Sequence, residues 1–120
     1  MSVKNVNDVE RLDVPAGKDT TIQVLISAQE GPNFAMRKFV IQPGGGMPLH
    51  TNKVEHEQYV LAGQADVQIG DEVHKVKPGD VVFIPESIQH SYQNTSDGPF
   101  EFLCLVPNKP DQIELVSEGK

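Results

Sequence analysis

Short runs of β-branched and aromatic residues alternate with turn signals along the chain, and this pattern restricts the fold more than any other feature. Spacing of this kind is typical of a β-sandwich or barrel, and no segment has a helical apolar period. The runs are TTIQVLIS, NFAMRKFVIQ, EQYVLAG, QADVQI, EVHKV, DVVFIP and FEFLCLVP, with IELV as a weaker last one. We therefore predict an all-β domain that closes as a double-sheet jelly roll or small barrel, because closure removes exposed strand edges.

The turn residues refine this prediction. Gly70-Asp71 suits a two-residue hairpin with glycine in the first central position. Lys77-Pro78-Gly79-Asp80 has the proline and glycine of a type II turn. We expect Pro43 and the glycines 44–46 to end the strand NFAMRKFVIQ, and DVVFIP to be a short buried strand.

Length and charge limit the organisation and the partners. A chain of 120 residues suits one domain over residues 1–120, and its polar ends, 1–18 and 108–120, are expected to be loosely held. Ten Lys and Arg against 17 Asp and Glu give a net charge of −7, which argues against nucleic acid and against an anionic membrane surface as partners. A small-molecule ligand or substrate is the partner expected.

Cysteine content and the first residues bear on the compartment. Cys104 is the only cysteine, so an intrachain disulfide is impossible. The opening MSVKNVNDVERLDV lacks the apolar stretch of a secretory signal. No apolar run is long enough for a transmembrane helix. We expect a cytoplasmic protein.

The four histidines are the candidate functional residues. His50 and His56 follow the glycine run, and His90 follows the separate segment KPGDVVFIPESIQ. Strands that fold back on one another can bring these two clusters together, and three imidazoles in one place would form a metal site. Asn52 stands where a fourth ligand would be expected. His74 lies in the charged run EVHK, and we expect it at the surface.

These residues resemble the cupin superfamily, specifically its small single-domain members. The first cupin motif is glycine, five residues, His-x-His, three or four residues, Glu, six residues and glycine. Residues 44–63 are similar to it: Gly44 and His50 match, Asn52 replaces the second histidine, His56 replaces the glutamate, and Gly63 matches.

The second cupin motif lies at residues 79–94. Its pattern is glycine, five residues, Pro-x-Gly, two residues, His, three residues and Asn. Gly79, Pro85, His90 and Asn94 match, with Ser87 in place of the middle glycine. The resemblance implies the cupin double-stranded β-helix, a jelly-roll barrel. The string EHEQYVLAG is similar to the four-histidine subgroup of small bacterial and archaeal cupins.

Carried over by position, the resemblance implies metal ligation by His50, His56 and His90, with Asn52 doubtful. The rival register makes Glu57 the ligand, but only five residues then separate it from Gly63, so we favour His56. Alternation along a strand places His56 and Gln58 on one face and Glu57 on the other. Asn52 is open to three interpretations: a weak ligand, a residue that leaves a position for water or substrate, or a plain loop residue.

Gln58, Phe102 and Cys104 are candidates for the lining of the site. Phe102 and Cys104 share a strand face, and they would wall the metal cavity if that face looks inward. The alternative, which we favour for Cys104, is a small buried apolar residue. With Asn52, Gln58 would orient the substrate or support the ligands.

Neutral imidazoles leave the charge of a divalent ion uncompensated, which attracts anionic chelating molecules. The resemblance implies three-histidine dioxygenases, so the leading hypothesis is a dioxygenase-type oxidoreductase using Fe, Mn or Cu. The alternatives are a non-catalytic ligand-binding, metal-binding or sensor module, and a redox-neutral metal isomerase or lyase. The metal stays open among Mn, Fe, Cu, Ni and Zn. Cupins commonly form homodimers, and TTIQVLIS is the strand that we expect to serve this purpose.

Overall fold

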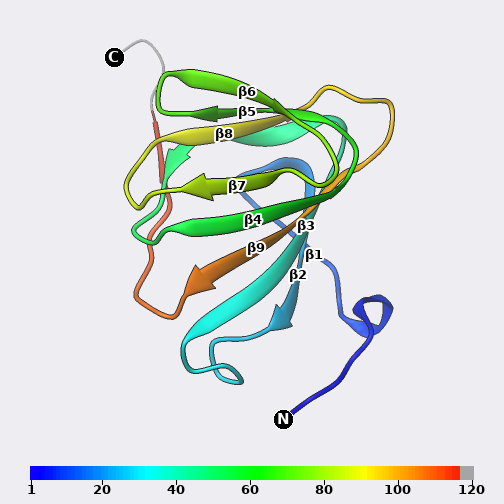
Figure 1. Cartoon of the computed structure of the whole chain (residues 1–120), viewed down its shortest axis with the longest axis vertical. Helices are drawn as coiled ribbons and strands as arrows, with labels where there is room; N and C mark the ends of the chain where they lie inside the picture. The colour runs from blue at the N-terminus through cyan, green and yellow to red at the C-terminus, as the bar shows by residue number, and fades with distance from the viewer. Residues whose placement is uncertain (117–120) are drawn as a thin grey trace.

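The chain folds into β-strands and one 3-10 turn, in a computed structural model that describes residues 1–116 (Figure 1). The elements of this part of the chain are η1 (Val6–Asp8), β1 (Leu12–Asp13), β2 (Lys18–Ile26), β3 (Phe34–Thr51), β4 (His56–Ala62), β5 (Ala65–Ile69), β6 (Glu72–Val76), β7 (Val81–Ile84), β8 (His90–Asn94), β9 (Phe100–Pro107) and β10 (Glu114–Leu115). The all-β prediction is therefore confirmed.

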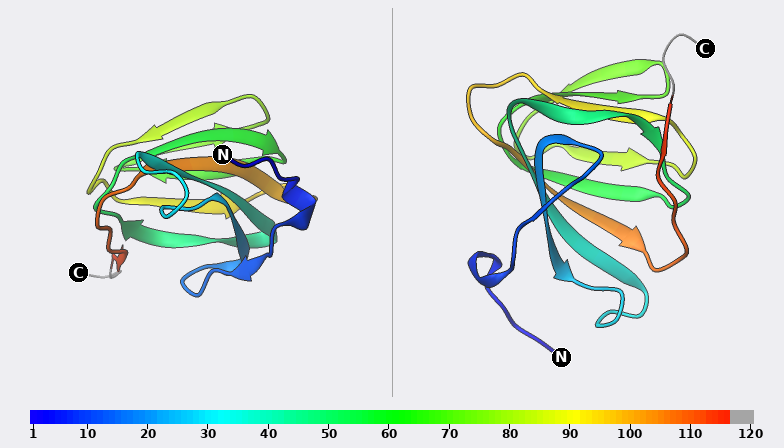
Figure 2. Two further views of the ribbon diagram at one scale, coloured as in Figure 1. Left: turned by 90° about the horizontal axis from the view of Figure 1, so that it is seen from below. Right: turned by 180° about the vertical axis from the view of Figure 1, so that it is seen from behind.

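The strands form two antiparallel layers that share β3. The first half of β3 pairs with β2 and β9, and β9 continues to β4 and β7. The second half of β3 pairs with β8 and β10, and β8 continues to β5 and β6. Because one strand belongs to both layers, the sheet curls round on itself into the predicted jelly-roll barrel (Figures 1 and 2).

The glycine run corrects one prediction. Pro43 and the glycines 44–46 do not end the strand, because β3 continues through them from Phe34 to Thr51. Gly44 has a φ of 80°, a conformation that only glycine adopts readily. A Cβ on Gly46 would lie 2.2 Å from the carbonyl oxygen of Tyr92. These residues are the bend at which β3 passes from one layer to the other.

Both predicted turns are confirmed. Gly70 has a φ of 59°, and the hairpin closes on the pair Ile69 and Glu72. Gly79 has a φ of 92°, and the Asp80 amide donates to the Lys77 carbonyl at 3.0 Å, as a type II turn requires. The prediction for DVVFIP was wrong in part, because β7 alternates: Val81 and Phe83 face outward, with exposed fractions of 77% and 54%.

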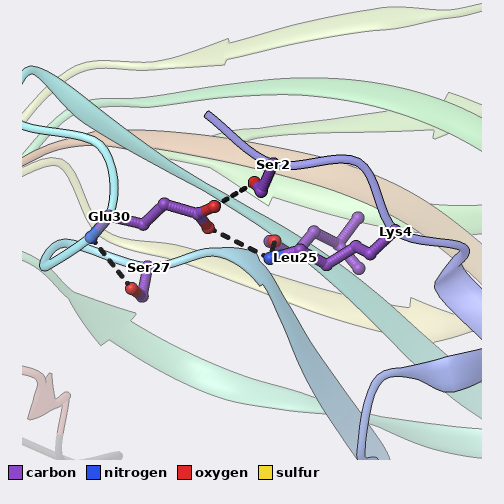
Figure 3. Close-up of polar contacts among 5 residues, drawn as sticks. All are labelled: Ser2, Lys4, Leu25, Ser27 and Glu30. Carbon is purple, nitrogen blue, oxygen red and sulfur yellow. Dashed lines mark hydrogen bonds and ion pairs between the residues drawn. The ribbon is translucent and has the colours of Figure 1, made fainter.

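The two ends are held more firmly than we expected. Gln23 Nε2 donates to the carbonyls of Val6 and Val9 at 2.8 and 2.9 Å. Near the N-terminus, Ser2 and Lys4 both donate to the Glu30 carboxylate beyond the end of β2 (Figure 3). At the other end, β10 pairs with β3. Residues 117–120 of the predicted loose tail lie outside the described residues.

The barrel interior is apolar at its centre. Phe102 stacks between Phe39 and Tyr92, with 5.2 Å between ring centroids on each side. Further buried side chains close this core, among them Ile41, Val60, Val67, Ile84 and Phe100. Among residues 1–116, no helix is long and apolar enough to cross a membrane. The homodimer stays a prediction, and β2, its expected strand, already pairs with β1 and β3 within the chain.

Candidate functional site

The three predicted ligand histidines lie together inside the barrel. His50 lies near the end of β3, and its cross-strand partner is His90, the first residue of β8. His56 is the first residue of β4. The ring centroids of His50 and His90 are 4.1 Å apart, and those of His56 and His90 are 5.5 Å apart. All three are buried, with exposed fractions of 4%, 6% and 1% for His50, His56 and His90.

Backbone carbonyls orient two of the rings. His50 Nδ1 lies 2.7 Å from the Pro48 carbonyl, and His90 Nδ1 lies 2.9 Å from the Ile88 carbonyl. A carbonyl only accepts, so each Nδ1 must carry the proton. In the neutral ring this leaves a lone pair on Nε2, the atom that a metal or a ligand proton would meet.

His56 differs from its two neighbours. Neither of its ring nitrogens has a hydrogen-bond partner among the described residues, although both are buried. His90 Nε2 is likewise buried and unpaired within this part of the chain. Burying a polar atom without a partner is costly, so these nitrogens are available to bind a further group.

All three imidazoles are held neutral. Burial lowers the pKa of His56 to about 3, and the positive charge of Arg37 adds to this effect. Burial also lowers the pKa of His90 to about 4, against the opposing hydrogen bond to Ile88. The pKa of His50 is lowered for the same reason. Neutral imidazole is the form that binds metals.

In their present orientations, the rings of His50, His56 and His90 do not form a coordination sphere. Over residues 1–116, no group of three or more His, Cys, Asp or Glu side chains has the geometry to hold a metal ion. His56 is the ring of the three that has no hydrogen bond to the described residues, so its rotation is the least restrained by polar contacts. Any shared ion would therefore require a rearrangement, most simply at His56.

A pocket of about 420 Å³ opens onto two of these histidines, and we call it the histidine pocket. Its volume is in the range of small-molecule sites. Its lining residues are Asp13, Val14, Pro15, Ile22, Arg37, Phe39, Met47, His50, Asn52, His56, Asp111 and Ile113. Hence His50 and His56 are within reach of a small molecule that enters it.

Asn52 lies in the wall of the histidine pocket and is fixed by the C-terminal segment. Its Nδ2 donates to Asp111 Oδ2 at 3.1 Å, and Asp111 Oδ1 accepts from the Lys53 amide at 2.6 Å. The Asn52 Oδ1 atom is buried and has no partner among residues 1–116. The contact with Asp111 thus orients the Asn52 amide and leaves its Oδ1 available to accept a hydrogen bond.

One inward-facing row of side chains crosses three strands beside the histidines. Arg37 of β3 pairs with Cys104 of β9, which pairs with Gln58 of β4. Arg37 Nη2 donates to Cys104 Sγ at 3.3 Å, while Gln58 Nε2 donates to the Tyr92 hydroxyl at 2.6 Å and lies 3.6 Å from Cys104 Sγ. Burial raises the pKa of Tyr92, so its hydroxyl stays protonated.

The other predicted residues fall on both sides of the barrel wall. Phe102 and Cys104 are buried on the inward face, with exposed fractions of 3% and 1%. Glu57 alternates with the buried His56 and Gln58, and it is only half-buried. His74 is exposed, and its Nε2 lies 3.4 Å from Glu72 Oε1. It lines a different pocket, formed by β5, β6 and β7.

Sequence reasoning missed three polar residues of this region. Arg37 had a weak signal, since it shares a strand face with the apolar Ala35 and Phe39. Tyr92 had a similar signal, two residues after His90 on one strand face. Asp111 had none, because it lies in a polar tail whose path along β3 depends on tertiary contacts.

Comparison with known families settles the family of the chain. Residues 37–106 match the Cupin_2 family of cupin domains. The chain belongs to the cupin family.

The individual relatives differ in what they are named for. The chain is 32% identical over 102 residues to 1-methylthio-D-xylulose 5-phosphate methylsulfurylase of Rhodospirillum rubrum, covering 85% of this cupin and 65% of that protein. This cupin therefore spans slightly less than two thirds of that relative. The polyketide cyclase RemF from Streptomyces resistomycificus has a TM-score of 0.85 at 30% identity, covering 98% of this cupin and 88% of the cyclase. A cupin-2 domain protein from Rhodospirillum rubrum gives 0.86 at 29% identity, with coverages of 98% and 81%.

Proposed function

We propose that this cupin is a metal-dependent enzyme that acts on a small enolisable molecule in the histidine pocket. His50, His56 and His90 would hold one divalent transition-metal ion. The observation that carries the proposal is the buried cluster of neutral imidazoles, in which His56 and His90 keep nitrogen atoms without partners among the described residues.

The chemistry of the donor set suits such an ion once His56 has rotated toward the other two rings. The Nδ1 protons of His50 and His90 are directed to backbone carbonyls, which is the arrangement that orients a metal-binding histidine. Nitrogen ligands suit Mn, Fe, Cu, Ni and Zn, so the residues select a class of metal rather than one element. A bound divalent ion acts as a Lewis acid that polarises a carbonyl oxygen and stabilises an enolate.

The other residues of the pocket have distinct tasks in this proposal. The unpaired Asn52 Oδ1 would accept a hydrogen bond from a ligand or a water, with Asp111 holding the amide in place. Gln58 is turned toward Tyr92 and Cys104, so it supports the wall instead of touching the substrate. Phe102 lies behind Phe39 in the apolar stack that excludes water from the interior.

Two reaction types are compatible with this site. The first is a dioxygenase-type oxidation, for which an Fe, Mn or Cu ion held by His50, His56 and His90 would supply the redox chemistry. A redox-neutral isomerisation or elimination is the second. It is favoured by the names of the two similar enzymes, a methylsulfurylase and a polyketide cyclase, neither of which is named as an oxygenase.

Anaerobic reconstitution with Fe(II) or Zn(II), followed by incubation with dihydroxyacetone and pyruvate, tests the proposal. Histidine-dependent uptake of dioxygen with Fe(II) supports the oxidation. Exchange of the carbon-bound protons with deuterated water, seen by NMR with Zn(II) and no oxygen, supports the redox-neutral reaction. His56→Ala should abolish either signal and the surface control His74→Ala should retain it. Ligand binding without either reaction would instead indicate a non-catalytic module.

A further inference from the structure

Arg37 stands out among the polar residues that reach the histidine pocket. It is half-buried on the inward face of β3 and is the only Lys or Arg in the lining of this pocket, which lies wholly within the described chain. Its guanidinium carbon lies 5.2 Å from the centroid of the Phe39 ring, so the side chain is stacked along the pocket wall.

The hydrogen bonding of this guanidinium is incomplete. Arginine carries five N–H donors. The protein partner found within residues 1–116 is the weakly accepting Cys104 thiol, at 3.3 Å. Arg37 Nε is buried and has no partner in the same part of the chain. A structural arginine normally lies against a carboxylate or carbonyl, which is a far better acceptor than sulfur.

The nearby acids do not supply that acceptor. Asp13 and Asp111 also line the histidine pocket, but both residues are exposed, and Asp111 is already bonded to Asn52 and the Lys53 amide. Arg37 lines the same pocket as His50 and His56, and its positive charge contributes to the lowered pKa of His56. A ligand between Arg37 and His56 would thus meet a cation at one end and imidazole nitrogens at the other.

We infer that Arg37 binds a carboxylate group of the substrate, so that the substrate is a small carboxylic acid whose reacting end lies toward His50, His56 and His90. Only the placement of the reacting end near the three histidines rests on the proposed function. A planar guanidinium binds a carboxylate with two parallel hydrogen bonds, and Nε would take part in one of them. One arginine in a pocket that also contains two aspartates suits a singly charged carboxylate better than a phosphate dianion.

Pyruvate, the simplest enolisable 2-oxo acid, is the probe. Its dissociation constant is measured by ligand-observed NMR on the full chain, both metal-free and loaded with diamagnetic Zn²⁺. Arg37→Met should raise this constant about 10- to 100-fold, the effect expected for loss of hydrogen bonds to a charged group. Arg37→Lys should recover part of the affinity, because lysine keeps the positive charge but cannot make two parallel hydrogen bonds to a carboxylate.

Lys53→Met is the matched control, since it removes the same charge at an exposed position next to Asn52. It should leave the dissociation constant essentially unchanged. Circular dichroism is the check that each variant is folded, and Arg37→Lys keeps the inference testable if Arg37→Met does not fold.

The outcomes separate this inference from the proposed function. Arg37-dependent pyruvate binding by a chain that takes up no metal would uphold the inference and contradict the metal proposal. Zn²⁺ uptake with pyruvate binding unchanged in Arg37→Met would do the reverse. The inference is also overturned if the wild type does not bind pyruvate up to tens of millimolar, or if Arg37 supports tighter binding of inorganic phosphate than of pyruvate.

Discussion

His50 and His90 are cross-strand partners whose rings lie 4.1 Å apart, and each directs its Nδ1 to the carbonyl of the residue two positions earlier. The two halves of the site are therefore built alike, although they come from different motifs and different strands. Pro48 and Ile88 supply these carbonyls. The arrangement leaves both Nε2 atoms available before any ligand arrives.

This geometry predicts the tautomers of the metal-free protein. At neutral pH, His50 and His90 should both be uncharged with the proton on Nδ1, because the carbonyl partners can only accept. Long-range proton–nitrogen NMR spectra of nitrogen-15-labelled protein measure this directly. The exposed His74 provides the reference for a ring outside the buried cluster. A proton on Nε2 of either ring, or a doubly protonated ring, would contradict the geometry.

The buried histidines also predict how stability depends on pH. Their folded pKa values, about 3 for His56 and about 4 for His90, are below the ordinary 6.5 of an unfolded chain. The unfolded state thus binds more protons, so the free energy of unfolding is highest above this ordinary pKa and falls as the pH drops toward the folded values. Urea unfolding of the metal-free protein at a series of mildly acidic to neutral pH values measures this slope.

His56→Gln isolates the contribution of one ring. The variant should have a flatter pH profile than the wild type over this range, because glutamine does not titrate. Glu57, whose pKa is raised to about 7 mainly by burial, titrates in the same range but is present in both proteins. Parallel profiles would mean that the pKa of His56 is not lowered by folding.

The bend of β3 predicts a large effect of a single methyl group. In Gly46→Ala the new Cβ would lie 2.2 Å from the Tyr92 carbonyl oxygen, which belongs to the backbone and cannot rotate away. We expect the free energy of unfolding to fall by about 1–3 kcal/mol or more, as for other overpacked sites. Gly98→Ala is the control, since its Cβ would meet no atom within 4 Å. Equal thermal stability of the two variants would show that the close approach is unimportant.

Much of the fold could be predicted because it depends on local signals. Alternation placed Phe102 and Cys104 on one strand face, which the structure shows to be the inward one, and the glycines at 70 and 79 defined their turns. The bend at residues 43–46 was misinterpreted as a strand end, since the same glycines serve a turn or a close approach between two layers. Only the tertiary contact with Tyr92 distinguishes the two.

The site was predictable to a similar extent. The spacing of two motifs singled out the three histidines, and alternation placed His56 on the face opposite to Glu57. The anion-binding role of Arg37 was not predictable, because it depends on which neighbours leave the guanidinium unsatisfied. The contact between Asp111 and Asn52 joins residues 59 positions apart, and no periodicity encodes it.

That contact gives a further prediction. Asp111→Ala removes the acceptor of the Lys53 amide, which is bonded at 2.6 Å. Hydrogen exchange at this amide should accelerate about 10- to 100-fold, the range expected for loss of a hydrogen bond to a charged group. Asp97→Ala, which removes the same charge from an exposed loop, should leave the rate unchanged. An unaltered rate in Asp111→Ala would show that the C-terminal segment does not hold the edge of the pocket.

The most direct test of the metal site is elemental analysis of the protein purified without an affinity tag, with metal counted per chain. We predict close to one transition-metal ion per chain in the wild type and in His74→Ala, and little in His56→Ala or His90→Ala. A wild-type chain without metal even after anaerobic reconstitution, or full metal content in both buried-histidine variants, would contradict the proposed site.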